Sequence, residues 1–523
     1  MSSKSLFTSI FGTMLPQADA RNAAGGPAFA LSAKQALAQY AATGCLNSTF
    51  YAGAEEQLER VLELAAQVEP EFIARVALYT RAKGHMKDMP ALLVAVLSVR
   101  SPGLMAEVFE RVIDSPKMLR NFVQIMRSGR VGRKSLGTLP KRLVQQWLES
   151  RTDEQLFRGS VGNAPSLADV IKMVRPRPAT ARRAALFGYL VGKPYDAAAL
   201  PELVRRFEAF KVNPSLFTGA EMPEAPMEML TSLALGASHW RVLAQRASWQ
   251  ALRMNLNTFA RHGVFADQGA AAEAAAQLRD AALIAKARAF PYQVMAAYTS
   301  VGAGVPAEIK DALQDALESA LAAVPAIDGK VWVFPDVSGS MQSPVTGRRK
   351  GATTSVRCID VATLVAAAIV RKNPGAGVVP FSDTVLSAAL NPRDSVMTNA
   401  RVLAALPAGG TNCAAPLAYL NERGLKGDLL IYVSDNESWL DGGRPSGGST
   451  ATLAEWQTFK RRNPCARLVC LDVQPAGTTQ APERADILNI GGFADSVFGV
   501  IAEFNAGTLH PDHWVGVIEK ESI

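Results

Sequence analysis

The spacing of apolar residues changes once along this chain, near residue 325, and the change separates two kinds of fold. Before it, apolar residues recur every three or four positions in successive segments, which is the period of an amphipathic helix. After it, short apolar runs alternate with helical segments. Because 523 residues are too many for one hydrophobic core, we predict two domains, residues 1–326 and residues 327–523.

The first domain is predicted to be all-helical. The pattern predicts helices over residues 55–68, 72–83, 90–99, 145–149, 201–210, 249–262, 270–289 and 307–323. Pro and Gly interrupt the chain between them, as at Ser101-Pro102-Gly103. Many helices of this length with short connections are typical of stacked helical hairpins, so we predict a HEAT-like helical-repeat fold.

The second domain is predicted to be α/β. Strand-like runs at residues 330–334, 377–381, 428–433 and 467–473 alternate with helical stretches at residues 356–372, 414–423 and 453–461. This alternation predicts a parallel sheet wrapped by helices, of the Rossmann-like kind. In such sheets, ligands bind beyond the carboxyl ends of the strands.

Oxygen-bearing side chains follow three of these strand-like runs. Asp336, Ser338 and Ser340 stand at alternate positions after the first run, Thr411 ends a Gly-Gly-Thr turn, and Asp435 follows the third run. Hydroxyl and carboxylate oxygens suit a hard cation such as Mg²⁺. The five positions resemble the metal-ion-dependent adhesion site of von Willebrand factor A domains, and they predict a divalent-cation site with Mg²⁺ as the expected ion.

Each residue of this site is given a role. Ser338 and Ser340 bind the ion directly, Thr411 binds it directly or through water, and Asp336 and Asp435 hold metal-bound waters. One coordination position stays open for the carboxylate or phosphate of a partner. The simpler alternative is that Asp336 and Ser338 only cap the turn that follows them.

Motifs for catalysis are weak. The residues around Ser338 lack the Gly-x-Ser-x-Gly pattern of a nucleophile elbow, and a phosphotransferase would need a second carboxylate near Asp336. Residues 129–135 depart from a phosphate-binding loop because Arg133 replaces the Gly that would precede Lys134. We therefore predict a protein that is not an enzyme.

Basic residues are concentrated in the first domain, where Lys and Arg outnumber Asp and Glu by 37 to 28, against 18 to 19 in residues 327–523. Residues 115–148 contain eight basic residues and residues 170–195 contain six, and neither stretch contains an acidic one. Such stretches predict a surface that meets phosphates. The candidate RNA-binding residues are Lys117, Arg120, Arg127, Arg130, Arg133, Lys134, Lys141, Arg142, Lys172, Arg175, Arg177 and Arg182.

The form of nucleic acid follows from the residue types. Arg suits bidentate phosphate contact and stacking on unpaired bases. The chain lacks a compact duplex-reading motif such as a zinc finger, so structured or single-stranded RNA is favoured over duplex DNA. For any single residue, the alternative is an ordinary solvated face or an arginine that packs on a neighbouring acidic helix.

Three observations favour a cytoplasmic protein that does not enter a membrane. The number of cysteines is five and no Cys-x-x-Cys occurs, which does not suggest a disulfide framework. No apolar run approaches the length of a membrane span. The apolar stretch at residues 6–15 is diluted by polar residues, which argues against a signal peptide.

In combination, these features resemble the Ro autoantigen family, the TROVE-domain proteins, over nearly the whole chain. The resemblance is carried by residues 35–44 and 49–52, by Gly132-Arg133-Lys134 with Trp147, and by residues 249–256. It implies a closed ring of helical repeats with a central hole, shut by the A domain. The resemblance assigns the metal residues by direct match. It assigns the RNA-binding regions around Arg133, Lys134 and Arg175 only approximately. Asn412 stands where many A domains have Asp, which removes one charge beside the site.

The resemblance also implies partners. They are small noncoding Y RNA on the outer basic surface, misfolded RNA whose single-stranded end threads the hole, and, in bacterial relatives, the 3′ exoribonuclease polynucleotide phosphorylase. Our first hypothesis is therefore a noncatalytic scaffold for noncoding RNA that assists RNA quality control. The second is a Mg²⁺-dependent protein-binding module without RNA. A metal-dependent hydrolase of phosphate esters is a third, but it lacks a general base near Asp336.

Overall fold

The computed structural model describes residues 15–44, 46–287, 291–321, 324–348, 356–439, 449–492, 494 and 496–523. The chain forms two compact units. The sheet unit consists of Met1–Leu64 and Leu321–Glu519, and the helical unit consists of Ala65–Ala320 and Lys520–Ile523. The sheet unit thus contains residues from both predicted domains, while the boundary between residues 326 and 327 stays a prediction.

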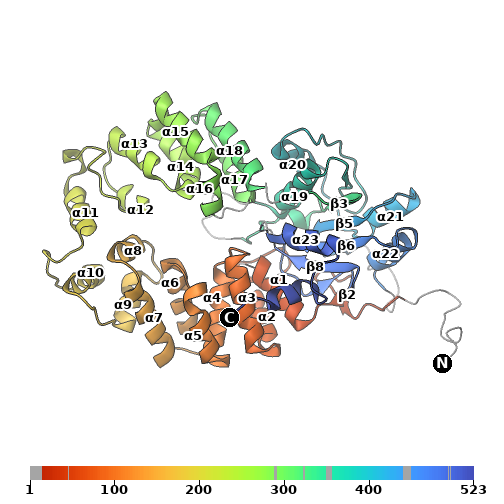
Figure 1. The fold of residues 1–523 in the computed structure, drawn as a ribbon, viewed down its shortest axis with the longest axis horizontal. Helices are drawn as coiled ribbons and strands as arrows, with labels where there is room; N and C mark the ends of the chain where they lie inside the picture. Colours follow the sequence, from red (N-terminus) through yellow and green to blue (C-terminus); the bar gives the residue numbers. More distant parts are fainter. Residues whose placement is uncertain are drawn as a thin grey trace. The chain divides into compact units, whose positions relative to one another are not determined.

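The helical unit is built from consecutive helices that pack on their neighbours in the chain, as α3 does on α4 and α4 on α5 (Figure 1). Hydroxyl caps begin many of them: the Ser115, Thr152 and Ser166 side chains accept hydrogen bonds from backbone N–H groups in the first turns of α6, α8 and α9. The helices are α3 (Pro70–Ala82), α4 (Asp88–Arg100), α5 (Pro102–Val112), α6 (Pro116–Arg127), α7 (Thr138–Ser150), α8 (Asp153–Arg158), α9 (Leu167–Val174), α10 (Ala181–Val191), α11 (Glu202–Val212), α12 (Met227–Leu230), α13 (Ala237–Arg246), α14 (Trp249–Arg261), α15 (Gln268–Arg279), α16 (Ala281–Ala287), α17 (Pro291–Ser300) and α18 (Ala307–Ala320).

The helical prediction is confirmed, with one helix divided. The segment predicted as one helix over residues 270–289 forms α15 and α16, and its last two residues lie outside the described residues. Asp280 separates the two helices because its backbone is extended and its carboxylate accepts a hydrogen bond from the Leu283 N–H at 3.0 Å. An Asp in this position caps the next helix rather than continuing the previous one.

The sheet unit contains a five-stranded parallel sheet of order β4-β3-β5-β6-β8, as the alternating pattern predicts. Its strands are β3 (Val331–Pro335), β4 (Gly377–Val378), β5 (Leu429–Ser434), β6 (Arg467–Asp472) and β8 (Ile487–Gly491). Every residue of β5 is buried, because helices cover both faces of the sheet. The covering helices are α19 (Cys358–Lys372), α20 (Val396–Ala404), α21 (Ala415–Glu422), α22 (Ala451–Arg462), α23 (Ser496–Ala506) and α24 (His513–Glu519).

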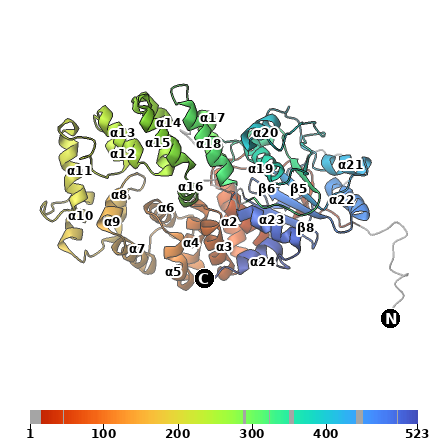
Figure 2. The ribbon, with the colours of Figure 1, turned by 45° about the horizontal axis from the view of Figure 1, so that its top comes forward.

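Residues near the start of the chain are part of the sheet unit. Strands β1 (Ala20–Arg21), β2 (Pro27–Ala30) and β7 (Thr478–Thr479) form a small antiparallel sheet. Helix α1 (Ala33–Thr43) packs on β8 and on α24. Strand β8 and helix α24 are neighbours in Figure 2. Helix α2 (Ala54–Gln67) contains the boundary between the units. In the described part of the chain, none of the helices combines the length and apolar character needed to cross a bilayer.

Candidate metal site and basic surface

The first loop of the candidate metal site follows β3. Asp336 is buried and accepts hydrogen bonds from the Ser338 N–H at 2.8 Å and from the Ser434 hydroxyl at 2.6 Å. The hydroxyl oxygens of Ser338 and Ser340 lie 3.3 Å apart, and both side chains are buried. The loop therefore presents two hydroxyls close together, beside a carboxylate whose position is fixed by hydrogen bonds.

Backbone hydrogen bonds join the second loop to the other two. The Gly339 N–H donates to the Gly409 carbonyl at 2.9 Å. The Thr411 carbonyl accepts from the Ser438 hydroxyl at 3.3 Å and from the Trp439 N–H at 3.2 Å. The Thr411 side chain itself is buried. The predicted loops thus meet at the carboxyl end of the sheet, where the parallel register of β3 and β5 brings their ends together.

The site would carry an excess of buried negative charge if its carboxyl groups were ionised. Burial raises the pKa of Asp336, and burial followed by the nearby Asp336 charge raises the pKa of Asp435 well above its usual value. Burial also raises the pKa of Glu437 to about 7 and that of Asp472 well above its normal range. Among the described residues, no Lys or Arg forms an ion pair with these four carboxylates. A bound cation would offset this charge.

The donor set fits Mg²⁺ or a similar hard cation, since it consists of three hydroxyls and two carboxylates. Within the described ranges, no three His, Cys, Asp or Glu side chains are placed to hold a metal ion, so any site here depends on the hydroxyls. Asn412 does not replace the missing carboxylate. Its amide oxygen accepts from the Ala414 N–H at 3.1 Å, and its amide nitrogen donates to the Asp383 carbonyl at 3.3 Å.

The predicted RNA-binding residues lie on or next to α6, α7, α9 and α10, and α9 contacts each of the other three (Figure 1). The Gln145 amide donates to the Val174 carbonyl at 2.6 Å, which ties α7 to the end of α9. Eight of the predicted side chains are exposed or half-buried and form no ion pair with a carboxylate in the described part of the chain. We call this set the basic surface: Lys117, Arg127, Lys134, Lys141, Arg142, Lys172, Arg175 and Arg177.

The other four predicted residues have partners within the protein. The Arg120 guanidinium donates to the Val161 carbonyl at 2.6 Å, and Arg133 donates to the Ser98 carbonyl at 2.7 Å. Arg182 forms ion pairs with Asp153 at 3.0 Å and with Glu154 at 2.5 Å. Arg130 is exposed but also interacts within the chain. Arg120, Arg133 and Arg182 therefore hold the helices together, whatever they contribute to binding.

Comparisons with known proteins agree with this architecture. Residues 330–505 match the family model described as the Ro60 vWA domain. The chain is 24% identical to RNA-binding protein RO60 of Deinococcus radiodurans over 526 residues, which span 95% of this chain and 97% of that protein. Its fold resembles the crystal structure of the Deinococcus radiodurans RO (RSR) protein, with a TM-score of 0.59 and 20% identity over 91% of this chain and all of that one. The chain is thus similar to Ro proteins over nearly its whole length.

The Ro-family match bears on the two candidate sites differently. The five metal residues lie inside residues 330–505, which match the vWA model. All eight residues of the basic surface lie outside that range, in the helical unit. The likeness to the solved Ro structure shows a shared fold alone. The metal and RNA assignments therefore still depend on the side chains of this chain.

Sequence reasoning missed several residues of the metal region. Asp472 ends β6 in register with Ser434 of β5, so the rule that selected Asp435 could also have selected Asp472. Its carboxylate accepts a hydrogen bond from the Gln39 amide at 2.8 Å. Burial, followed by the nearby Asp435 charge, raises the pKa of the Tyr51 phenol, so Tyr51 lies beside the site. Because Tyr51 is distant from the A domain in sequence, no local pattern connects it to the site.

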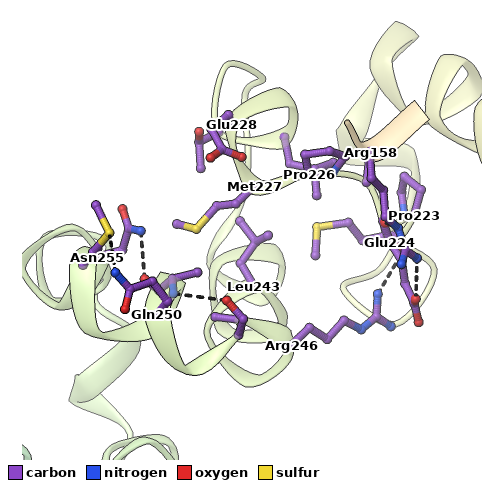
Figure 3. Close-up of a pocket in the computed structure, with 18 residues that line it drawn as sticks. Arg158, Pro223, Glu224, Pro226, Met227, Glu228, Leu243, Arg246, Gln250 and Asn255 are labelled. Carbon is purple, nitrogen blue, oxygen red and sulfur yellow. Dashed lines mark hydrogen bonds and ion pairs between the residues drawn. The ribbon is translucent and has the colours of Figure 1, made fainter. Parts of the chain in front are cut away.

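The helical unit also contains a cavity of about 930 Å³ lined by residues of α8, α12, α13, α14 and the chain before α12 (Figure 3). Its Arg158 side chain pairs with Glu224 at 3.1 Å, and its Arg246 side chain donates to the Met222 carbonyl at 2.8 Å. Both guanidinium groups thus bind residues that line the cavity. None of the residues predicted to bind metal or RNA lines the cavity, although part of the segment 249–256 does.

Proposed function

We infer that this chain is a noncatalytic RNA-binding protein whose helical unit holds RNA through the basic surface. The observation that supports this function is the basic surface. Its eight Lys and Arg side chains lie on neighbouring elements of the fold and form no ion pair with any carboxylate in the described part of the chain. The name of the relative, RNA-binding protein RO60, supports the same reading. Such a surface releases counterions when it meets phosphates, which gives binding that depends strongly on salt.

The finer parts of the proposal concern the RNA and its fate. The proposed ligands are a small noncoding Y RNA, held along the basic surface, and the single-stranded ends of misfolded RNA. Arginines such as Arg142 and Arg175 suit both phosphate contact and stacking on unpaired bases. The proposed setting is RNA quality control in the cytoplasm, with a 3′ exoribonuclease such as polynucleotide phosphorylase as the partner that degrades the RNA.

The metal site supports a second candidate function. Ser338, Ser340 and Thr411 would hold Mg²⁺ with Asp336 and Asp435 in support, and the ion would supply a position for an oxyanion from a partner. The observation that favours this role is the excess of buried carboxylate beside the hydroxyls. A protein partner gripped through an acidic side chain would make the chain a Mg²⁺-dependent protein-binding module. Co-purification of a protein that chelator releases, without RNA, would favour this second function.

Charge reversal tests the first function. The double variant Lys134→Glu/Arg142→Glu changes two exposed residues of the basic surface, whereas Lys286→Glu changes an exposed lysine of α16 as a matched control. At about 1.4 kcal/mol for each phosphate contact, the double variant should bind a structured RNA roughly 100-fold more weakly. The control should bind as the wild type does. Equal affinity for all three proteins in an anisotropy titration would reject the proposed RNA surface.

A further inference from the structure

The cavity of the helical unit is lined by more apolar than polar residues, and these come from separate elements. Met227 of α12, Leu243 of α13 and Gln250 of α14 lie around the same space (Figure 3). Met222 and Met254 also line it. The volume of about 930 Å³ is within the range of roughly 300–1,000 Å³ that is usual for pockets that take small ligands. Because methionine sulfur makes favourable contacts with aromatic rings, this lining suits a flat aromatic group.

Several oxygen atoms in the lining lack hydrogen-bond donors. The Gln250 amide oxygen is buried and has no hydrogen-bond partner among the described residues, while its amide nitrogen meets only a weak acceptor, the Met254 sulfur, at 3.7 Å. The Asn255 amide nitrogen donates to the Ala251 carbonyl at 2.9 Å, and the Asn255 oxygen accepts no hydrogen bond from the described residues. Glu228 lines the cavity and forms no ion pair in the described part of the chain. A ligand that fills the cavity must therefore bring N–H donors for these oxygens.

The charged residues of the lining do not suit a phosphate. The Arg158 guanidinium is paired with Glu224, and Arg246 donates to the Met222 carbonyl. The carboxylates of Glu224 and Glu228 would repel a second anion. The group that enters the cavity is therefore neutral, and any phosphates attached to it lie outside.

Neighbouring helices carry the basic surface and one wall of the cavity. Helix α8 contributes Arg158 to the lining and packs on α10, and α10 packs on α9. Lys172 of the basic surface lies on α9, and Arg175 follows the last residue of that helix. Phosphate-binding side chains and the cavity thus belong to consecutive elements of one compact unit.

We propose that the cavity binds an unpaired nucleobase that carries an exocyclic amino group, in single-stranded RNA whose phosphates lie on the basic surface. The flat face of the base contacts the methionines, and its amino group donates to the Gln250 oxygen. Adenine, cytosine and guanine have such an amino group, whereas uracil presents an acceptor, O4, in its place. The inference rests on the proposed RNA-binding function and adds a preference among bases, which phosphate contacts alone cannot give.

An apolar helix of a partner protein fits this lining less well than a base does. Its side chains would cover the Gln250 and Asn255 oxygens without supplying a donor, and a polar group that is buried without a partner lowers affinity. A nucleobase brings the flat face and the N–H donor together. Recognition of unpaired bases by stacking and by hydrogen bonds to their edges is also the usual way in which proteins read single-stranded RNA.

The test compares the affinity of the full chain for labelled six-nucleotide oligoadenylate and oligouridylate at one salt concentration. The wild type should bind oligoadenylate about tenfold more tightly, which is the effect of one hydrogen bond to a buried acceptor. Ala251→Phe fills the cavity and Gln250→Leu removes the acceptor, so each should lower the affinity for oligoadenylate to that for oligouridylate. Ala272→Phe, a change at an exposed alanine of α15 outside the lining, is the matched control and should keep the wild-type preference.

Methionine methyl resonances of the ¹³C-labelled wild type locate the bound base. Oligoadenylate should shift the resonances of Met222, Met227 and Met254, because the ring current of the base acts on nearby methyl groups. The resonance of Met105, which is buried in α5, should not change. The shifts should be absent in Ala251→Phe.

Three results would overturn the inference. The first is a preference for oligoadenylate that both cavity variants retain. The second is a leucine-rich helical peptide that shifts the three cavity methionines where oligoadenylate does not. The third is equal wild-type affinity for the two oligonucleotides, which would leave the proposed function standing if both bind in a salt-dependent way. Equal binding of a structured RNA by the wild type and by Lys134→Glu/Arg142→Glu would instead reject the proposed function.

Discussion

The charged side chains of the basic surface are exposed or half-buried, whereas those of the metal site are buried. Residues such as Lys134 and Arg142 are accessible to solvent and form no ion pair with described carboxylates, so their effect depends on their number rather than on their geometry. Asp336 and Asp435 are buried, the Ser434 hydroxyl donates a hydrogen bond to Asp336, and Asp336 is close enough to raise the pKa of Asp435. The first arrangement suits a long polyanion. The second suits one small cation. Salt should therefore test the basic surface, and chelator and pH should test the metal region.

The largest effect is expected from salt. If RNA neutralises about six cations of the basic surface, the log–log slope of affinity against salt is about −4 for single strands. Raising the salt from about 50 to about 200 mM then weakens binding roughly 300-fold, because the released counterions must be recaptured. Titrations of a structured RNA at several salt concentrations measure this slope. Removal of Mg²⁺ by chelator should change it little, and a flat response would contradict the charge-driven account.

The metal region should respond to Mg²⁺ through stability. At about 100 times its dissociation constant, Mg²⁺ would stabilise the wild type by roughly 2.7 kcal/mol, while Asp435→Asn should abolish this gain. In chelator, the same variant should be more stable by about 1 kcal/mol, which is a few degrees in melting temperature, because it buries neither a charge nor a proton-binding group. Calorimetry with and without Mg²⁺ measures both effects.

The matched control for this variant is Asp383→Asn, which changes an exposed carboxylate near Gly409. It should retain the Mg²⁺ response and show no gain in chelator. Destabilisation of metal-free protein by Asp435→Asn, together with an unchanged Mg²⁺ response, would contradict the assignment of Asp435 to the site.

A smaller effect separates burial from metal binding. Burial raises the pKa of Glu483 to about 7, although hydrogen bonds from Asn489 partly offset the rise. The folded state therefore holds this proton more tightly than the unfolded state, and the contribution to stability falls as pH rises from about 4.5 to about 7. Glu483→Gln should remove this slope and be more stable than the wild type at pH 8 by on the order of 1 kcal/mol.

Denaturant unfolding at pH 5 and at pH 8 measures the difference. Glu503→Gln, a change at an exposed carboxylate of α23, should follow the wild type at both pH values. Addition of Mg²⁺ should not alter the Glu483→Gln effect. A Mg²⁺-dependent effect would mean that burial alone does not explain the raised pKa.

The sequence predicted the parts of the molecule that local patterns encode. The runs ending before Asp336 and Asp435 form parallel strands, and strand ends in one sheet must share an edge, so the meeting of the three loops could be predicted. The strand β8 was missed because Ile487–Gly491 is short and follows a loop without a clear alternating pattern. The position of Tyr51 beside Asp435 was also missed, since these residues are far apart in the chain.

The basic residues of the helical unit also show what sequence patterns can and cannot predict. The acid-free stretches correctly marked exposed cations such as Arg142 and Lys172. They could not show that Arg133 is turned to the Ser98 carbonyl, because that contact depends on how α4 packs beside the loop after α6. Arg182 pairs with Asp153 and Glu154, which lie outside its own acid-free stretch. Composition over a window therefore identifies a charged region, while tertiary packing selects which of its members are available.

The location of bound RNA tests the central claim most directly. Lysines of the full chain can be acetylated with and without a saturating structured RNA, and the modified positions quantified by mass spectrometry. The account predicts protection of Lys117, Lys134, Lys141 and Lys172, with Lys286 and Lys426 modified equally in both samples. Protection of Lys286 or Lys426 without protection of the basic surface would contradict it.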